Sequence, residues 1–132
     1  MGSYQYQAIG AGLPEIPMLT IQLFQPGNPQ ASRSGCLSIL DTGSDCTLLP
    51  LPLLIGAKGK PIQGMTLIPV VGIEVLAIPV MIGLRFDDHE LLTVRVYGCS
   101  IEEFGDIGLI GRDILNRFRI DFDGPRLAFN VT

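Results

Sequence analysis

The chain is poor in basic residues, and this shortage argues against nucleic acid as a partner. Lysine and arginine number 9 against 13 aspartate and glutamate residues, so the formal net charge is -4 at pH 7. The cationic residues also form no local cluster. Proteins that bind a phosphate backbone usually carry such a cluster, and we therefore expect no nucleic-acid partner.

Long apolar runs are missing as well. The most apolar segment, residues 61–84, is interrupted by prolines, glycines and a glutamate, whereas a transmembrane helix needs about 20 mainly apolar residues. The first residues also lack the basic start and apolar core of a signal peptide. These features predict a cytoplasmic protein without a membrane partner.

Cysteine and histidine are scarce. The three cysteines, Cys36, Cys46 and Cys99, are an odd number without CxxC spacing, which argues against a disulfide framework and a zinc cluster. The single histidine, His89, stands among acidic residues and outside any HExxH motif. A thiol protease built on Cys46 and His89 lacks an orienting third group. We expect reduced, buried thiols and no metal or other cofactor.

Glycine and proline are frequent, which favours one all-β domain. The chain has 132 residues with 16 Gly and 10 Pro, and residues 1–132 suffice for a single core, with residues 1–16 expected to be flexible. Apolar and polar side chains alternate over residues 18–24, with the period of a half-buried strand. Spacing on one face predicts a helix only at residues 112–118. Further strands are predicted at residues 35–40, 65–69, 73–83, 91–97 and on both sides of a turn at residues 123–125.

An acid, a hydroxyl and a glycine stand between two apolar stretches in residues 38–49, SILDTGSDCTLL. The apolar flanks predict a buried backbone around Asp41, where an ionised carboxylate is costly unless neighbours stabilise it. Taken alone, the tetrapeptide Asp-Thr-Gly-Ser favours a structural turn, because these residues hydrogen-bond nearby backbone. A second motif, LIGRD at residues 109–113, makes the combination far more specific.

This combination resembles the retropepsin-like aspartic proteases, the single-domain relatives of retroviral protease. In that family a DTG or DSG turn follows a hydrophobic strand, and an apolar-apolar-Gly-Arg-Asp/Asn segment opens a helix near the C-terminus. The resemblance extends from about residue 19 to residue 131. It implies a retropepsin-like closed β-barrel with a flap hairpin and one short C-terminal helix.

The resemblance also implies roles for the residues of the Asp41 turn. Asp41 matches the catalytic carboxylate, and Thr42 matches the hydroxyl that locks two active-site loops together across a dimer. Gly43 matches the position where bulk would block the substrate backbone. Ser44 is a candidate donor of a further hydrogen bond to the carboxylates. The substrate-binding residues that the resemblance implies are Gly43, Ser44, Asp45, Gly64 and Met65.

The resemblance also implies that the second motif, residues 109–113, supports the active site structurally. In the family, the residues that match Asp45 and Arg112 form a buried ion pair that braces the site; the alternative is two unrelated surface charges. Gly111 and Asp113 belong to the same supporting segment. If the pair is buried, loss of Arg112 strands a charge and costs several kcal/mol.

Peptide hydrolysis by carboxylates needs two of them sharing one proton, one as general base and one as general acid. The sequence contains one Asp-Thr-Gly motif. Asp123-Gly124 has no hydroxyl residue between the acid and the glycine, and Asp106 is followed by an apolar residue where the motif has threonine or serine. A second copy must therefore supply the partner, which predicts a homodimer. The expected function is an aspartic endopeptidase that cleaves extended, hydrophobic peptide segments.

The predicted flap departs from the family pattern. A typical flap tip is rich in glycine, whereas residues 62–75, IQGMTLIPVVGIEV, contain only Gly64 and Gly72 and include Pro69. This leaves the position of the tip open, and it favours the alternative of a weakly active or inactive dimer that binds peptides. A further alternative is an enzyme that processes its own precursor ahead of Leu19.

Overall fold

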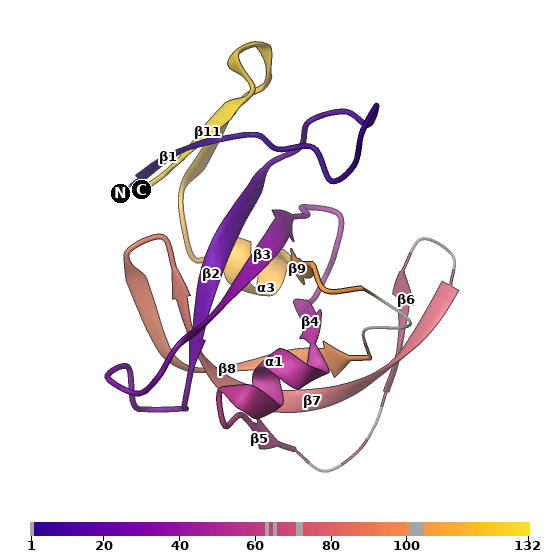
Figure 1. Ribbon diagram of the computed structural model, residues 1–132, viewed down its shortest axis with the longest axis vertical. Helices are drawn as coiled ribbons and strands as arrows, with labels where there is room; N and C mark the ends of the chain where they lie inside the picture. Colours follow the sequence, from indigo (N-terminus) through magenta and orange to yellow (C-terminus); the bar gives the residue numbers. More distant parts are fainter. Residues whose placement is uncertain (1, 63, 65, 71–72, 101–104) are drawn as a thin grey trace.

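A closed barrel of β-strands forms the body of the molecule (Figure 1). The computed structural model describes residues 2–62, 64, 66–70, 73–100 and 105–132. Around the barrel, in hydrogen-bonded order, run β2 (Met18–Phe24), β3 (Ser34–Leu40), β9 (Gly108–Ile110), β4 (Leu48–Pro50), β8 (His89–Cys99) and β7 (Ile73–Phe86). Because β2 also pairs with β7, the sheet closes on itself. The predicted all-β, retropepsin-like barrel is confirmed.

Alternation in β2 explains how the barrel acquires its core. Ile21 and Leu23 are fully buried while Thr20 between Leu19 and Ile21 is exposed, as the period of a strand requires. The core continues through Ile82 and Leu84 on β7. Each such side chain removed from water contributes about 1.5–3 kcal/mol. A bulge separates Ile82 from Leu84, at a glycine whose missing side chain leaves room for the ring of Phe24.

Within the described residues, two α-helices lie on the barrel, where the sequence predicted one. α3 (Arg112–Leu115) is shorter than the predicted helix, and the chain continues in turns to Phe118. α1 (Leu51–Gly56) was not predicted, because the prolines of this stretch suggested irregular chain. A proline in the first turn costs a helix no hydrogen bond, and the buried Leu54 holds α1 against the core. No helix within the described residues is long and apolar enough to span a bilayer.

A hairpin projects from the barrel at the predicted position of the flap (Figure 1). It consists of β6 (Thr66–Val70) and the first part of β7, paired antiparallel. Val70 lies opposite Ile73, and this is the last pair of the hairpin within the described residues. β5 (Lys60–Pro61) pairs farther along β7.

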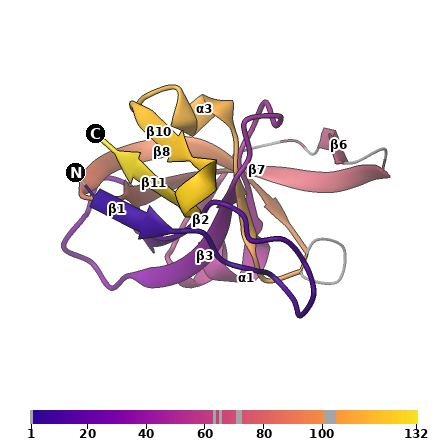
Figure 2. The ribbon, with the colours of Figure 1, turned by 90° about the horizontal axis from the view of Figure 1, so that it is seen from above.

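A separate sheet joins the two ends of the chain (Figures 1 and 2). Its strands are β1 (Gly2–Gln5), β11 (Ala128–Val131) and β10 (Ile120–Asp123), with β11 in the middle. The predicted turn at residues 123–125 is present as the 3-10 helix η1 (Gly124–Arg126). Within the start of the chain that was expected to be flexible, β1 pairs with β11 along its whole length and the Tyr4 ring stacks on Phe129 at 5.2 Å.

Candidate active site

Asp41 lies at the end of β3, in the turn that the sequence predicted. Its N–H donates to the carbonyl of Ile110 (2.9 Å), so β9 fixes the start of the turn. Its Oδ1 accepts the N–H of Gly43 (2.9 Å), and its carbonyl accepts the N–H of Ser44 (3.2 Å). The expected burial of this stretch was wrong in part, since Asp41 is half-buried while Thr42 and Gly43 are exposed. The carboxylate is therefore both oriented and accessible.

The hydroxyl of Ser44 does not support the carboxylate as the sequence suggested. It donates instead to the carbonyl of Cys46 (2.8 Å), which closes the turn on its C-terminal side. The carbonyl of Ser44 accepts the N–H of Arg112 (2.8 Å). Ser44 is thus a bridge between the Asp41 turn and the start of α3.

Arg112 connects both sides of the turn. Its guanidinium donates to the carbonyl of Thr42 (2.8 Å) and forms an ion pair with Asp45. The predicted pairing of Asp45 with Arg112 is confirmed, but its predicted burial is wrong in the single protomer: the side chains are 88% and 43% exposed. The ion pair itself is therefore worth about 0–1 kcal/mol, and the bond to Thr42 does more to hold the turn.

Thr47 and Asp113 form a second connection, and no pattern in the sequence indicated the role of Thr47. The hydroxyl of Thr47 donates to Asp113 Oδ1 (2.7 Å), and its N–H donates to Asp113 Oδ2 (3.1 Å). The same hydroxyl accepts the N–H of Gly111 (3.1 Å). Thr47 is fully buried between apolar residues, and a polar residue in such a place signals a hydrogen-bonded function.

Gly111 and Asp113 have the supporting positions that were predicted. A side chain at Gly111 would collide with the backbone of Cys46, so only glycine allows the two segments to approach this closely. Asp113 lies in the first turn of α3 and also accepts the N–H of Ile114 (2.9 Å). Gly111 and Asp113 together hold the start of α3 close to the chain segment that follows the Asp41 turn.

An apolar cluster lies beside the turn and extends towards the flap. We call it the flap-base cluster; its buried members are Leu48, Val75, Ala77 and Cys99, with Cys46, Tyr97 and Leu109 packed against them. Burial raises the pKa of the Cys46 thiol, and the charges of Asp113 and Asp45 raise it further. A thiol with a raised pKa stays protonated at neutral pH, which argues against nucleophilic chemistry at Cys46.

Of the two predicted substrate-binding residues in the flap region, the structure describes only Gly64. Gly64 precedes β6, at the open end of the hairpin, with a φ of 109°. Met65 lies outside the described residues. Their predicted contact with substrate stays a prediction.

His89 lies in the predicted exposed position at the start of β8. Its ring packs against Phe118, with centroids 4.9 Å apart. Together with Asp87 and Asp88 it forms a group whose possible ligand atoms lie within 4.8 Å of one another. Exposed acidic groups of this kind are common in proteins without a metal ion, and this group belongs to the turn between β7 and β8.

The chain is similar to known proteins in its structure, at low sequence identity. No family model matches the sequence, and no curated protein matches it either. Among solved structures, the chain is similar to the EIAV protease complexed with the inhibitor HBY-793, with a TM-score of 0.59 and 22% identity over 83% of this chain and 93% of that one. It is also similar to a retropepsin-like aspartic protease from Rickettsia conorii, with a TM-score of 0.59 and 15% identity over 100% and 99% of the two chains. The chain therefore has the fold of the retropepsin-like aspartic proteases, as its two motifs predicted.

Proposed function

We propose that this protein is an aspartic endopeptidase that works as a homodimer, with Asp41 of each copy in one shared active site. The observation that carries the proposal is the Asp41 turn, which presents an oriented, half-buried carboxylate between β3 and β4. The sequence contains a single Asp-Thr-Gly motif, so the second carboxylate comes from a second copy. Both similar structures described above are of proteases, which supports the same chemistry.

The reaction follows from two carboxylates placed a few ångström apart, which cannot both ionise. The ionised Asp41 takes a proton from a water molecule that attacks the peptide carbonyl. The protonated Asp41 of the second copy donates its proton to the carbonyl oxygen, which gives a tetrahedral diol. The C–N bond of the diol then breaks as the first Asp41 passes the proton taken from water to the leaving nitrogen, and the second Asp41 recovers its proton from a hydroxyl of the diol. The network from Arg112 and Thr47 keeps each turn in place while this proton exchange occurs.

The proposed substrate is an extended peptide with apolar side chains. Such a peptide binds as an added strand, with alternate side chains in separate pockets. The partly buried members of the flap-base cluster, Cys46, Tyr97 and Leu109, offer apolar surface beside the Asp41 turn, and the buried members support them from below. The hairpin of β6 and β7 is the proposed lid over the bound peptide.

The direct test compares wild type with Asp41→Asn in cleavage of a peptide library between pH 3 and pH 7. We expect Asp41→Asn to lower kcat/KM at least about 100-fold, because it removes the group that exchanges the proton. Asp106→Asn is the matched control, since Asp106 is exposed and lies outside the turn. A statine-type inhibitor should abolish cleavage by the wild type and by the control.

Other outcomes point to the alternative functions. Wild type and Asp41→Asn that are equally inactive, but that still bind peptides, would identify a binding or assembly module in place of an enzyme. Self-processing would appear in mass spectra as an Asp41-dependent cut ahead of Leu19.

A further inference from the structure

The face of the sheet that carries the flap-base cluster continues beyond the cluster along β7 and β8. Ala77 of β7 belongs to the cluster, whereas Val80 and Ile82 face the core of the barrel. Side chains alternate between the two faces of a strand, so Pro79 and Met81 lie on the same face as the cluster. Figure 1 shows that β7 extends from the flap hairpin past β5. This face therefore leads from the cluster towards β5.

Three side chains form a row across this face, where β5 joins β7. Met81 is paired with Lys60 of β5 on one side and with Arg95 of β8 on the other. Residues directly opposite each other in a ladder share a face, and we call these three residues the distal row. Adjacent strands lie about 4.8 Å apart, which places the backbones of Lys60 and Arg95 about 10 Å from each other. Both cations are exposed, and Met81 between them is half-buried.

Arg95 connects the distal row to the flap-base cluster. Its guanidinium lies over the ring of Tyr97, 5.7 Å from the ring centre. Tyr97 is a half-buried member of the cluster, and its N–H donates to the carbonyl of Thr47 (3.0 Å), in the segment between the Asp41 turn and β4. These contacts lead from the chain after the Asp41 turn to the distal row.

The two cations of the distal row have no acidic partner within the described part of the chain. The arginines that form ion pairs there are Arg33, Arg112, Arg119 and Arg126. Among the described residues, the side chain of Lys60 forms no hydrogen bond or ion pair, and that of Arg95 has only its contact with Tyr97. This is so although acids outnumber basic residues by 13 to 9 in the sequence. Exposed cations of this kind are complementary to an acid on another molecule.

The peptide of the proposed function is the molecule that reaches this face. A peptide that lies beside the Asp41 turn and under the flap hairpin covers the flap-base cluster with its apolar side chains. An extended peptide rises about 3.3 Å per residue, as β8 does, so the step from Tyr97 to Arg95 corresponds to about two residues of the peptide. A side chain about two positions beyond the one that packs on Tyr97 therefore meets the distal row.

We propose that Lys60 and Arg95 form a specificity site for an acidic side chain of the substrate, outside its apolar segment. The planar guanidinium of Arg95 binds a carboxylate through two hydrogen bonds, and stacking on Tyr97 holds it in position. Lys60 adds a second positive charge. In the proposed dimer each copy presents one such site, so acids can flank the apolar segment on both sides. This inference rests on the proposed function, because it specifies the substrate of that same active site.

The test measures peptide binding to Asp41→Asn, which is expected to leave peptides uncut, and cleavage by the wild type. The peptides have an apolar centre and one glutamate, which is moved outward one position at a time; matched peptides carry glutamine or lysine instead. At the position that meets the distal row, glutamate should bind about threefold to tenfold more tightly than glutamine, as expected for exposed charges. The value of kcat/KM should rise by a similar factor. High salt should weaken the preference, because it screens exposed charges.

Charge reversal identifies the residues. In Arg95→Glu and in Lys60→Glu the preference for glutamate should be lost, and lysine should become the better side chain at that position. Arg126→Glu is the matched control and should keep the preference. It reverses a side chain that is 85% exposed, next to β11, which Figure 1 shows on the opposite side of the molecule from β5. Thermal unfolding shows that each variant folds, and a reversed preference cannot come from an unfolded chain.

Three results would overturn the inference. The first is a wild type that treats glutamate and glutamine alike at every position, and the second is a pair of reversed variants that keep the wild-type preference. The third is tighter binding of a single-stranded oligonucleotide than of the acidic peptide, lost in Arg95→Glu, which would assign the cations to another partner.

The proposed function fails differently. A preference for acidic peptides in binding, without cleavage of any peptide by the wild type, contradicts the enzyme and leaves the acid-binding site standing. Cleavage of acidic and neutral peptides at equal rates contradicts the site alone.

Discussion

Asp113 receives two hydrogen bonds from Thr47, one from the hydroxyl (2.7 Å) and one from the backbone N–H (3.1 Å). Thr47 is fully buried, and its hydroxyl also accepts the N–H of Gly111. One side chain thus connects the chain after the Asp41 turn to the start of α3. The two motifs that the sequence displays separately are held together by a residue that belongs to neither of them.

Thr47→Val should lower the free energy of unfolding by about 2–3 kcal/mol, because it keeps the shape of the side chain but leaves the buried N–H of Gly111 without an acceptor. Thr47→Ser is the control, since it retains the hydroxyl. Urea unfolding of the three proteins measures the difference. A loss in the serine variant as large as that in the valine variant would contradict this expectation, because it would show that the methyl group matters as much as the hydroxyl.

Arg112→Lys tests whether the guanidinium positions the turn or stabilises the fold. The exposed ion pair with Asp45 contributes at most about 1 kcal/mol, so the melting temperature should change little. Cleavage should fall at least about tenfold, because a lysine cannot bond both Asp45 and the carbonyl of Thr42 in the planar geometry of arginine. Asp45→Asn, which removes the charge but leaves Arg112 on Thr42, should lose less activity. A large drop in the melting temperature of Arg112→Lys would instead support the predicted buried ion pair between Asp45 and Arg112.

The sequence predicted the elements whose structure depends mainly on residues that are close together in the chain. Residues 18–24 form β2 with the predicted bounds, because alternation of apolar and polar side chains is a property of the strand itself. The position of Asp41 in a turn followed from the residues on both sides of it. α1 was missed because prolines both end and begin helices, and only the burial of Leu54 in the folded chain decides between the two.

Other features depend on contacts that no local pattern contains. β1 is a short polar strand that is stabilised by pairing with β11 at the other end of the chain. The role of Thr47 depends on how β4 lies against the segment before α3. The pairing of Asp45 with Arg112 followed from the family resemblance, but the exposure of this pair depends on what surrounds it in three dimensions.

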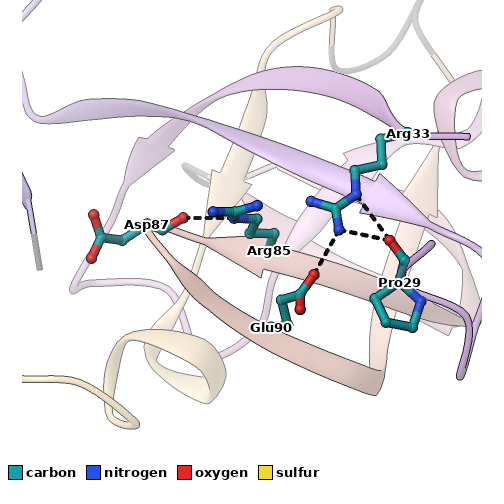
Figure 3. Close-up of polar contacts among 5 residues, drawn as sticks. All are labelled: Pro29, Arg33, Arg85, Asp87 and Glu90. Carbon is teal, nitrogen blue, oxygen red and sulfur yellow. Dashed lines mark hydrogen bonds and ion pairs between the residues drawn. The ribbon is translucent and has the colours of Figure 1, made fainter. Parts of the chain in front are cut away.

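Arg33 connects the loop between β2 and β3 to the start of β8 (Figure 3). Its guanidinium donates to the carbonyl of Pro29 (2.6 Å) and to Glu90 (2.7 Å), and it lies 5.5 Å from the centre of the Phe24 ring. Arg33→Gln should cost about 1 kcal/mol and should speed hydrogen exchange in residues 25–33. Arg117→Gln, at an exposed arginine after α3, is the control. Unchanged exchange in the loop would contradict this role.

Tyr4 and Asp87 make the attachment of β1 dependent on pH. The hydroxyl of Tyr4 donates to the carboxylate of Asp87. Burial, followed by the hydrogen bond to Asp87, raises the pKa of Tyr4 to about 12. Burial is the largest single effect on Asp87 and would raise its pKa, but the hydrogen bonds to its carboxylate, of which that from Tyr4 is the strongest, together outweigh burial and lower the pKa to about 2. The pair is thus held in its hydrogen-bonded form between these two values.

The sign of each effect follows from linkage. The contribution of Asp87 to stability is complete above its ordinary pKa of 3.8 and is lost as the pH falls towards 2. The contribution of Tyr4 is complete below its ordinary pKa of 10.0 and is lost as the pH rises towards 12. Tyr4→Phe should therefore lower the free energy of unfolding most between pH 4 and pH 10, and little at either extreme, because the wild type has lost the bond there. Chemical unfolding at a series of pH values, with Tyr6→Phe as the control, measures this, and a constant difference between wild type and Tyr4→Phe from pH 2 to pH 12 would show that only ring packing on Phe129 had changed.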